Sequence, residues 1–97
     1  MAKEIIWSPQ SEATFYKVVE YLQENWTDKE VDNFLVATEN VISYISEYPL
    51  MFRKTNKKNI HEALVTPQNL LIYKIYVNRI VLITFYDTRK SPRKKKF

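Results

Sequence analysis

The chain has 97 residues, of which 45% are hydrophobic and 14% aromatic, so it has material for one folded domain with one core and no room for a second. Cysteine and glycine are absent and His61 is the only histidine, which excludes disulfides, thiol nucleophiles and metal sites built on thiolates or paired histidines. Neither a secretory signal nor a run of about 20 apolar residues is present, so we expect a cytoplasmic protein with no membrane partner. We also expect no cofactor, no metal and no small-molecule substrate.

The net charge of +4 conceals an uneven distribution. Residues 1–48 carry three lysines against nine acidic residues, a balance of −6, whereas residues 49–97 carry twelve lysines and arginines against two acidic residues, a balance of +10. Such a basic half attracts polyanions or acidic partners.

The first half of the chain predicts a strand followed by two helices. Residues 3–7 (KEIIW) are a short apolar segment, typical of a strand. Ser8 and Pro9 are favoured at the N-cap and first position of a helix, and Asn25 is a plausible end for it. Apolar residues in between recur at steps of four, three and four, as on one helical face: Phe15, Val19, Leu22 and Trp26.

A second helix is predicted from Thr27 to Tyr48. Thr27 and Glu30 match a capping box, in which the hydroxyl and the carboxylate each accept a bond from a free backbone N–H. Pro49 ends this helix. Because the connection between the helices is short, residues 9–48 should form an antiparallel helical hairpin. The apolar positions of the second helix follow a three-to-four spacing: Val31, Phe34, Leu35, Thr38, Val41, Ile42, Ile45 and Tyr48.

The second half predicts β-structure. Residues 50–58 are interpreted as an irregular basic connection, and the segments 60–66, 69–77 and 80–86 are rich in the Ile, Val, Leu and Tyr typical of strands. Pro67-Gln68 lies in the first turn, and Asn78-Arg79 is predicted as a two-residue hairpin with Asn78 at the position that favours glycine. Residues 90–97 are expected to be an exposed, flexible basic tail.

The predicted fold class is therefore α+β, in a single domain over residues 1–97: a strand, an antiparallel two-helix hairpin, then a three-stranded antiparallel sheet. The helices should cover one face of this sheet. Both faces of the strands are apolar, which leaves the covered face open; its candidates are Tyr73, Ile75, Val81, Ile83 and Phe85.

The order of these segments resembles a known family. A strand that ends in W-S-P, a helical hairpin, the exit ISEYPLMFRK, the strand LIYKIY and the final FYDTRKSP are together similar to toxins of the RelE/ParE superfamily. The resemblance covers nearly the whole chain and implies the β-α-α-β-β-β fold of those toxins. It also implies a growth inhibitor from a type II toxin–antitoxin system, whose partner is a cognate antitoxin encoded by an adjacent gene.

Members of this family inhibit growth by one of two mechanisms. RelE-like members cleave messenger RNA on the ribosome, whereas ParE-like members inhibit DNA gyrase and lack the nuclease residues. Of three nuclease positions, one falls on the apolar Leu70, one matches Arg89, and the tyrosine or histidine expected after Arg89 is absent. This pattern and the long hairpin favour a ParE-like inhibitor acting on gyrase and DNA, which would not be an enzyme.

Two other hypotheses remain open. A ribosome-dependent, metal-independent ribonuclease would use Arg89 with His61 or Tyr86 as its catalytic groups. A basic nucleic-acid-binding module without toxicity would bind DNA or RNA in a salt-sensitive way. Tyrosines left over from the helical stripes are candidates for antitoxin contact: Tyr16, Tyr21 and Tyr44. Cations of the second half are candidates for contact with the target or with nucleic acid: Arg53, Lys54, Lys74, Arg79, Arg89 and Lys90.

Overall fold

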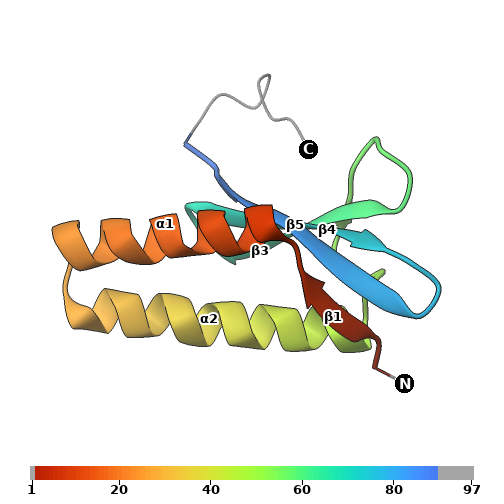
Figure 1. Cartoon of the computed structure of the whole chain (residues 1–97), viewed down its shortest axis with the longest axis horizontal. Helices are drawn as coiled ribbons and strands as arrows, with labels where there is room; N and C mark the ends of the chain where they lie inside the picture. Colours follow the sequence, from red (N-terminus) through yellow and green to blue (C-terminus); the bar gives the residue numbers. More distant parts are fainter. Residues whose placement is uncertain (1, 90–97) are drawn as a thin grey trace.

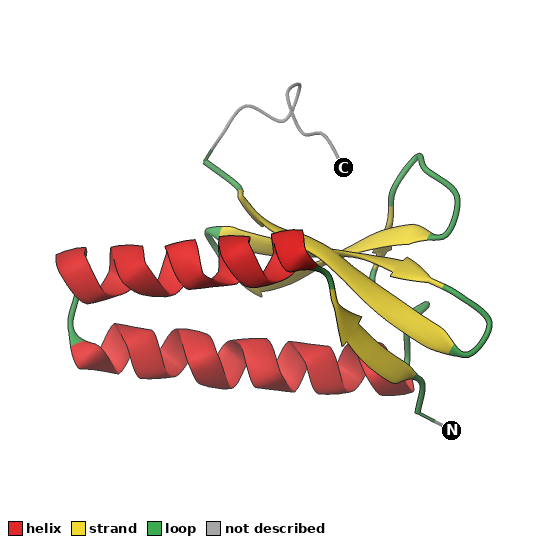
Figure 2. Ribbon diagram, viewed as in Figure 1, coloured by secondary structure: helices red, strands yellow, loops and turns green. Residues whose placement is uncertain are grey.

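The predicted helices and strands form two layers, in which both helices lie on one face of a single sheet (Figures 1 and 2). The protein is represented by a computed structural model that describes residues 2–89. The predicted tail, with Lys90, lies outside these residues. Along the chain the elements are β1 (Glu4–Trp7), α1 (Pro9–Asn25), α2 (Asp28–Glu47), β2 (Arg53–Lys54), β3 (Ile60–Thr66), β4 (Asn69–Ile75) and β5 (Arg79–Asp87).

The two helices begin differently. Ser8 caps α1 as predicted, because its Oγ accepts a hydrogen bond from the backbone N–H of Ser11 at 3.0 Å. Thr27 is the N-cap of α2, but its hydroxyl bonds to the carboxylate of Glu30 and to no backbone N–H. The predicted capping box is therefore wrong in its bonds, since its two side chains satisfy each other.

The sheet has five strands in the order β1-β5-β4-β3-β2, two more than predicted. The strand β1 joins the edge by pairing in parallel with β5, and the other neighbours are antiparallel. The segment 50–58 is not wholly irregular, because Arg53 and Lys54 pair with Glu62 and His61 of β3. Two charged residues have no strand pattern of their own, so only this long-range pairing makes β2 a strand.

An irregularity in β5 decides which of its side chains face the helices. Tyr73 pairs with Leu82 and the preceding Ile72 pairs with Thr84, so Ile83 is an extra residue on β5. Tyr73 and Phe85 are in the core as expected, and Ile75 packs against it. For Val81 and Ile83 the expectation is wrong: both are only half-buried, and the core instead takes Ile80 and Leu82, which are fully buried.

The beginning of α1 replaces β1 as the partner of β5 beyond Trp7. The backbone N–H and hydroxyl of Ser8 donate to the carbonyls of Leu82 and Ile83, at 3.2 and 3.0 Å. The Thr14 hydroxyl then accepts a hydrogen bond from the N–H of Phe85 at 2.9 Å. This side-chain contact satisfies a polar group at the bulge that no strand reaches.

Aromatic rings hold the helical layer on the sheet. The ring of Phe15 on α1 lies 5.3 Å from Trp7 and 5.5 Å from both Phe34 and Phe85, measured between centroids. Such clusters stabilise a core through large buried area and favourable ring geometry. The predicted apolar faces of the two helices extend too far at their C-terminal ends, because Trp26 and Tyr48 are 55% and 58% exposed.

The positive backbone angle expected of an asparagine occurs at Asn59. Its φ is 62°, and no other non-glycine residue among residues 2–89 has a positive φ. The β4–β5 hairpin turns through Val77-Asn78, not Asn78-Arg79, because the N–H of Tyr76 donates to the carbonyl of Arg79. Asn78 therefore does not take the conformation predicted for it.

Candidate functional site

Three of the six predicted target-contacting cations meet at one end of the sheet. Lys54 ends β2, Lys74 lies near the end of β4, and Arg79 begins β5. The loop 55–59 reaches the same end, since the carbonyl of Asn59 accepts a bond from the N–H of Ile75 at 2.8 Å. We call this surface the cationic end of the sheet; its members are Lys3, Lys54, Lys57, Lys58, Lys74 and Arg79.

Tyr76 contacts three members of this surface. The Lys74 Nζ and the Arg79 Cζ lie 5.3 and 4.8 Å from the centroid of its ring, within cation–π distance. The Lys3 Nζ donates to the carbonyl of Tyr76 at 2.9 Å. Three cations from three segments of the chain are thereby held around one residue.

The cationic end contains few acids to neutralise it. Within residues 2–89, ion pairs are made by Arg53 and Arg89, and by none of Lys3, Lys54, Lys58, Lys74 or Arg79. Glu4 is the register partner of Arg79 on β1, yet it forms no ion pair with it. The surface therefore keeps most of its positive field.

Arg53 is beside this surface and differs from it in having a partner. Its Nε lies 3.6 Å from an Oε of Glu62, to which it is opposed in the β2–β3 ladder. Glu62 is buried, with 6% exposure, whereas the Arg53 side chain is 82% exposed. Arg53 compensates a buried carboxylate, which leaves less of its charge for a ligand.

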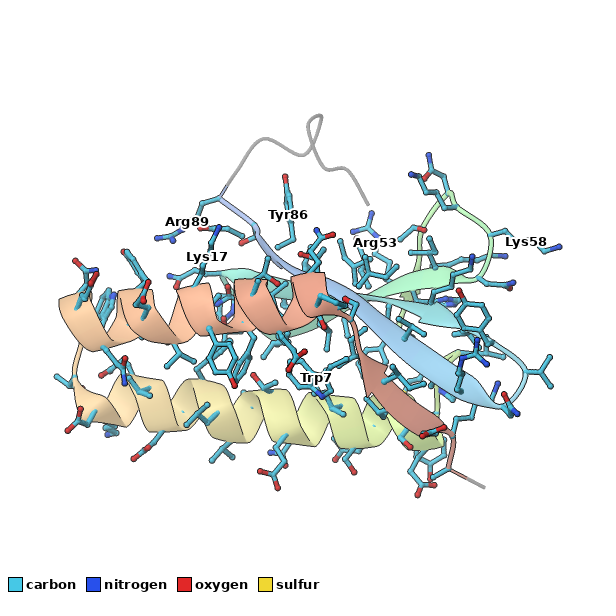
Figure 3. The ribbon with its side chains drawn as sticks, in the orientation of Figure 1. Trp7, Lys17, Arg53, Lys58, Tyr86 and Arg89 are labelled. Atoms are coloured by element: carbon cyan, nitrogen blue, oxygen red, sulfur yellow. The ribbon has the colours of Figure 1, made fainter. Side chains whose placement is uncertain are left out.

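Arg89 lies at the end of the sheet opposite the cationic end, beside Lys17 of α1 (Figure 3). Its guanidinium donates two hydrogen bonds to Asp87, at 3.0 and 2.8 Å, and its Cζ lies 5.7 Å from the ring centroid of Tyr21. The bonds to Asp87, more than the contact with Tyr21, raise the pKa of Arg89 above its usual value. A hollow of about 350 Å³ adjoins it and is lined by residues that include Lys17, Tyr21, Leu22, Phe85 and Asp87.

His61, a candidate catalytic group of the ribonuclease hypothesis, is buried. It is 5% exposed, and its ring stacks on Tyr73 with centroids 5.8 Å apart. Its Nδ1 has no hydrogen-bond partner in the described part of the chain. Burial, and secondarily the charge of Lys54, lower the pKa of His61, so the neutral imidazole is favoured.

The three candidates for ribonuclease chemistry are not brought together. Arg89 follows Asp87 by two residues, and Asp87 pairs with Asn69 of β4, whereas His61 pairs with Tyr73 of the same strand. Asn69 and Tyr73 are about 13 Å apart along β4 at the usual rise per residue. Tyr86 is opposite Leu70 and points away from the helices, on the face opposite that of His61 and Tyr73 (Figure 3). A phosphate shared by Arg89 and His61 would have to be within hydrogen-bond reach of both groups, which this separation does not allow.

A second, larger hollow lies between the helices. This groove has a volume of about 710 Å³. Tyr16 borders it, whereas Tyr21 borders the hollow beside Arg89, and Tyr44 is 54% exposed and lines neither. The predicted antitoxin tyrosines therefore do not form one patch. The groove is lined by Trp7, Glu12, Phe15, Tyr16, Leu35, Thr38, Glu39 and Ile42.

Several residues of these surfaces were missed by the sequence analysis. Trp7 was assigned only to a strand, and Lys3 and Tyr76 were not singled out at all. Lys3 could have been found by its position beside a strand, but its approach to Tyr76 depends on the parallel pairing of β1 with β5. Residues separated by 73 positions cannot be paired from periodicity alone.

Two further features were searched for in the part of the chain that the structure describes. No three His, Asp or Glu side chains there lie close enough together to hold a metal ion. Neither helix within residues 2–89 has the length and apolar character needed to cross a membrane.

Comparisons with known proteins identify the fold. No protein-family profile matches the sequence, and no curated protein is significantly similar to it. Among solved structures, a chain of the chromosomal ParDE toxin–antitoxin system of P. aeruginosa superposes with a TM-score of 0.75 at 4% identity, over 89% of this chain and 96% of that one. YafQ from the E. coli DinJ–YafQ toxin–antitoxin complex is a further neighbour, with a TM-score of 0.61 at 14% identity over 92% and 96% of the two chains.

The dimeric YoeB of Staphylococcus aureus is similar as well, with a TM-score of 0.58 at 18% identity over 87% of this chain and 94% of that one. In each case nearly the whole of both chains is matched. The chain therefore has the RelE/ParE-like toxin fold, which confirms the predicted architecture.

Proposed function

We propose that this chain is the toxin of a type II toxin–antitoxin pair and that it inhibits growth as ParE-like toxins do, by binding gyrase on DNA. The proposal is supported by a fold shared with chains of toxin–antitoxin systems. The observation that carries the non-enzymatic mechanism is the separation of Arg89 from His61. A neutral, buried imidazole on the helix-covered side of the sheet is out of reach of a substrate that Arg89 could hold.

The first experiment is induction of the chain in a bacterial host. Growth should stop, and purified protein should inhibit DNA supercoiling by gyrase while leaving ribosome-bound message uncut. Message cleavage without inhibition of gyrase would replace this proposal by the ribonuclease hypothesis. Harmless over-expression, with salt-sensitive binding of nucleic acid, would leave only a binding module.

Arg89→Ala separates the two toxic mechanisms within the same assay. The side chain is exposed and its pair is with a near neighbour, so the variant should fold. If Arg89 is a catalytic cation, message cleavage should be lost in the folded variant. Under our proposal no cleavage exists to be lost, and circular dichroism supplies the control for folding.

We further propose that the groove between α1 and α2 receives the antitoxin. Apolar Leu35 lies in its lining at 39% exposure, and the exposed Tyr16 stands beside it. Exposed apolar surface next to a hollow is typical of a site covered by a partner. Tyr21 and Tyr44 lie outside this groove, so a contact of either with the antitoxin would be separate from the groove contact.

Co-expression of the short reading frame expected beside this gene should restore growth. Leu35→Asp should prevent this rescue while toxicity persists, since the new carboxylate would be buried by the partner. The matched control is Val36→Asp, which places the same charge on the adjacent residue, 58% exposed and not part of the groove lining. Rescue of the Leu35→Asp toxin as effective as that of the control would refute the groove assignment.

A further inference from the structure

The cationic end of the sheet, rather than Arg89, has the composition of a nucleic-acid contact. Its cations come from the segment before β1, from β2, from the loop 55–59 and from both strands of the β4–β5 hairpin. Figure 1 shows this loop and this hairpin projecting from the same end of the sheet, away from the α1–α2 connection. Separate cations on projecting segments match the repeated charges of a phosphodiester chain.

The β4–β5 hairpin holds two of these cations in place before a ligand binds. Its strands place Lys74 and Arg79 on either side of the turn, and both lie against the ring of Tyr76. The ring restricts two long side chains that would otherwise lose conformational freedom on binding. Val77 is 94% exposed at the tip, so no other part of residues 2–89 covers the turn.

The neighbouring surface favours a phosphate backbone over an acidic peptide. The two hollows described above lie elsewhere, between the helices and beside Arg89. A peptide bound tightly by its side chains needs apolar pockets as well as charges. A phosphodiester backbone needs only cations and donors presented on a surface, which this end supplies.

We infer that Lys3, Lys54, Lys58, Lys74 and Arg79 bind the phosphodiester backbone of a nucleic acid, and that Tyr76 positions Lys3, Lys74 and Arg79 among them. This inference deepens the proposed function, since it assigns part of the gyrase–DNA target to the DNA and to a defined surface of the toxin. Tyr76 is a positioning residue in this site, because it acts through the cations that it holds.

The test is binding of a fluorescein-labelled 20-base-pair duplex to the full chain, followed by anisotropy between 50 and 200 mM salt. For Lys74→Gln/Arg79→Gln we expect weaker binding and a slope of log K against log salt that is smaller by about 1.8, or about 0.9 for each lost phosphate contact. The control Lys17→Gln/Lys29→Gln removes two charges from the helical hairpin and should leave the slope nearly unchanged. An equal loss in both variants would show a net-charge effect only and would overturn the inference.

Tyr76 provides a test that changes no charge. Tyr76→Leu should weaken binding about two- to fivefold, the size of an exposed cation–π contact, and Tyr76→Phe should bind like the unchanged protein. Equal affinity of Tyr76→Leu and Tyr76→Phe would remove the positioning role. An RNA hairpin of equal charge shows whether the backbone is DNA or RNA, and polyglutamate that competes as well as duplex would overturn the assignment to phosphate.

The outcomes separate this inference from the proposed function. A chain that inhibits gyrase but binds no duplex at 50 mM salt would refute the phosphate site and leave the toxin assignment intact. A chain that binds duplex through these residues but does not inhibit gyrase would keep the site and refute the mechanism.

Discussion

The imidazole of His61 stacks on the phenol of Tyr73, with the two ring planes 24° apart, where β3 and β4 pair beneath the segment that follows α2. The hydroxyl of Tyr73 donates to the carbonyl of Pro49 at 2.6 Å, so the same ring also fixes the end of the helical hairpin. Burial raises the pKa of Tyr73, which keeps this donor protonated. His61 thus belongs to the packing that joins the hairpin to the sheet.

The first prediction is that acid destabilises the protein through His61. Its pKa is lower in the folded state than the usual 6.5, so the unfolded chain binds the proton more readily. Stability should therefore fall as the pH drops below about 6.5. The urea midpoint should decrease between pH 7.5 and 5.5, and His61→Phe should reduce this decrease. Because the chain has one histidine, an unchanged pH dependence in the variant would contradict the assignment.

Thr14 should contribute to stability through its hydroxyl. Thr14→Val keeps the shape of the side chain but leaves the N–H of Phe85 without its acceptor, at a residue that is 6% exposed. We expect a loss of about 1–3 kcal/mol in the free energy of unfolding, measured by urea denaturation. Thr14→Ser retains the acceptor and should lose less; a Val variant as stable as the Ser variant would show that water serves equally well.

Asn59 should be replaceable by glycine and not by alanine. At a φ of 62° the β-carbon of alanine is unfavourable by about 1–2 kcal/mol, whereas glycine adopts this conformation freely. Thermal unfolding of Asn59→Ala should occur at a lower temperature than that of Asn59→Gly. The reverse order would mean that the asparagine side chain, and not its backbone angle, matters here.

Leu71 and Leu64 offer a matched test of the core. Leu71 on β4 is fully buried, whereas Leu64 on β3 is 56% exposed. Leu71→Ala should cost about 2–5 kcal/mol of unfolding free energy, because it removes transfer energy and leaves a cavity. Leu64→Ala should cost less than about 1 kcal/mol at its exposed position. Similar denaturation midpoints for the two variants would contradict the assignment of the core face.

The local sequence was sufficient to predict most of the helices and strands. Ser8-Pro9 specifies the beginning of α1, the apolar repeat through Phe34 and Ile45 specifies the buried face of α2, and Pro67-Gln68 specifies the β3–β4 turn. Each depends on residues within a few positions of one another, so periodicity and capping suffice. The fold class followed from their order, and the resemblance to RelE/ParE toxins added to it.

The faces of β5 and the relative positions of the site residues were decided by tertiary pairing alone. One extra residue at Ile83 reverses the faces of β5 and moves Ile80 and Leu82 into the core, which no count of apolar residues reveals. The same long-range register separates Arg89 from His61 and brings Lys3 to Tyr76. Sites are made by residues distant in the chain, and their distances depend on strand register, which local propensity does not encode.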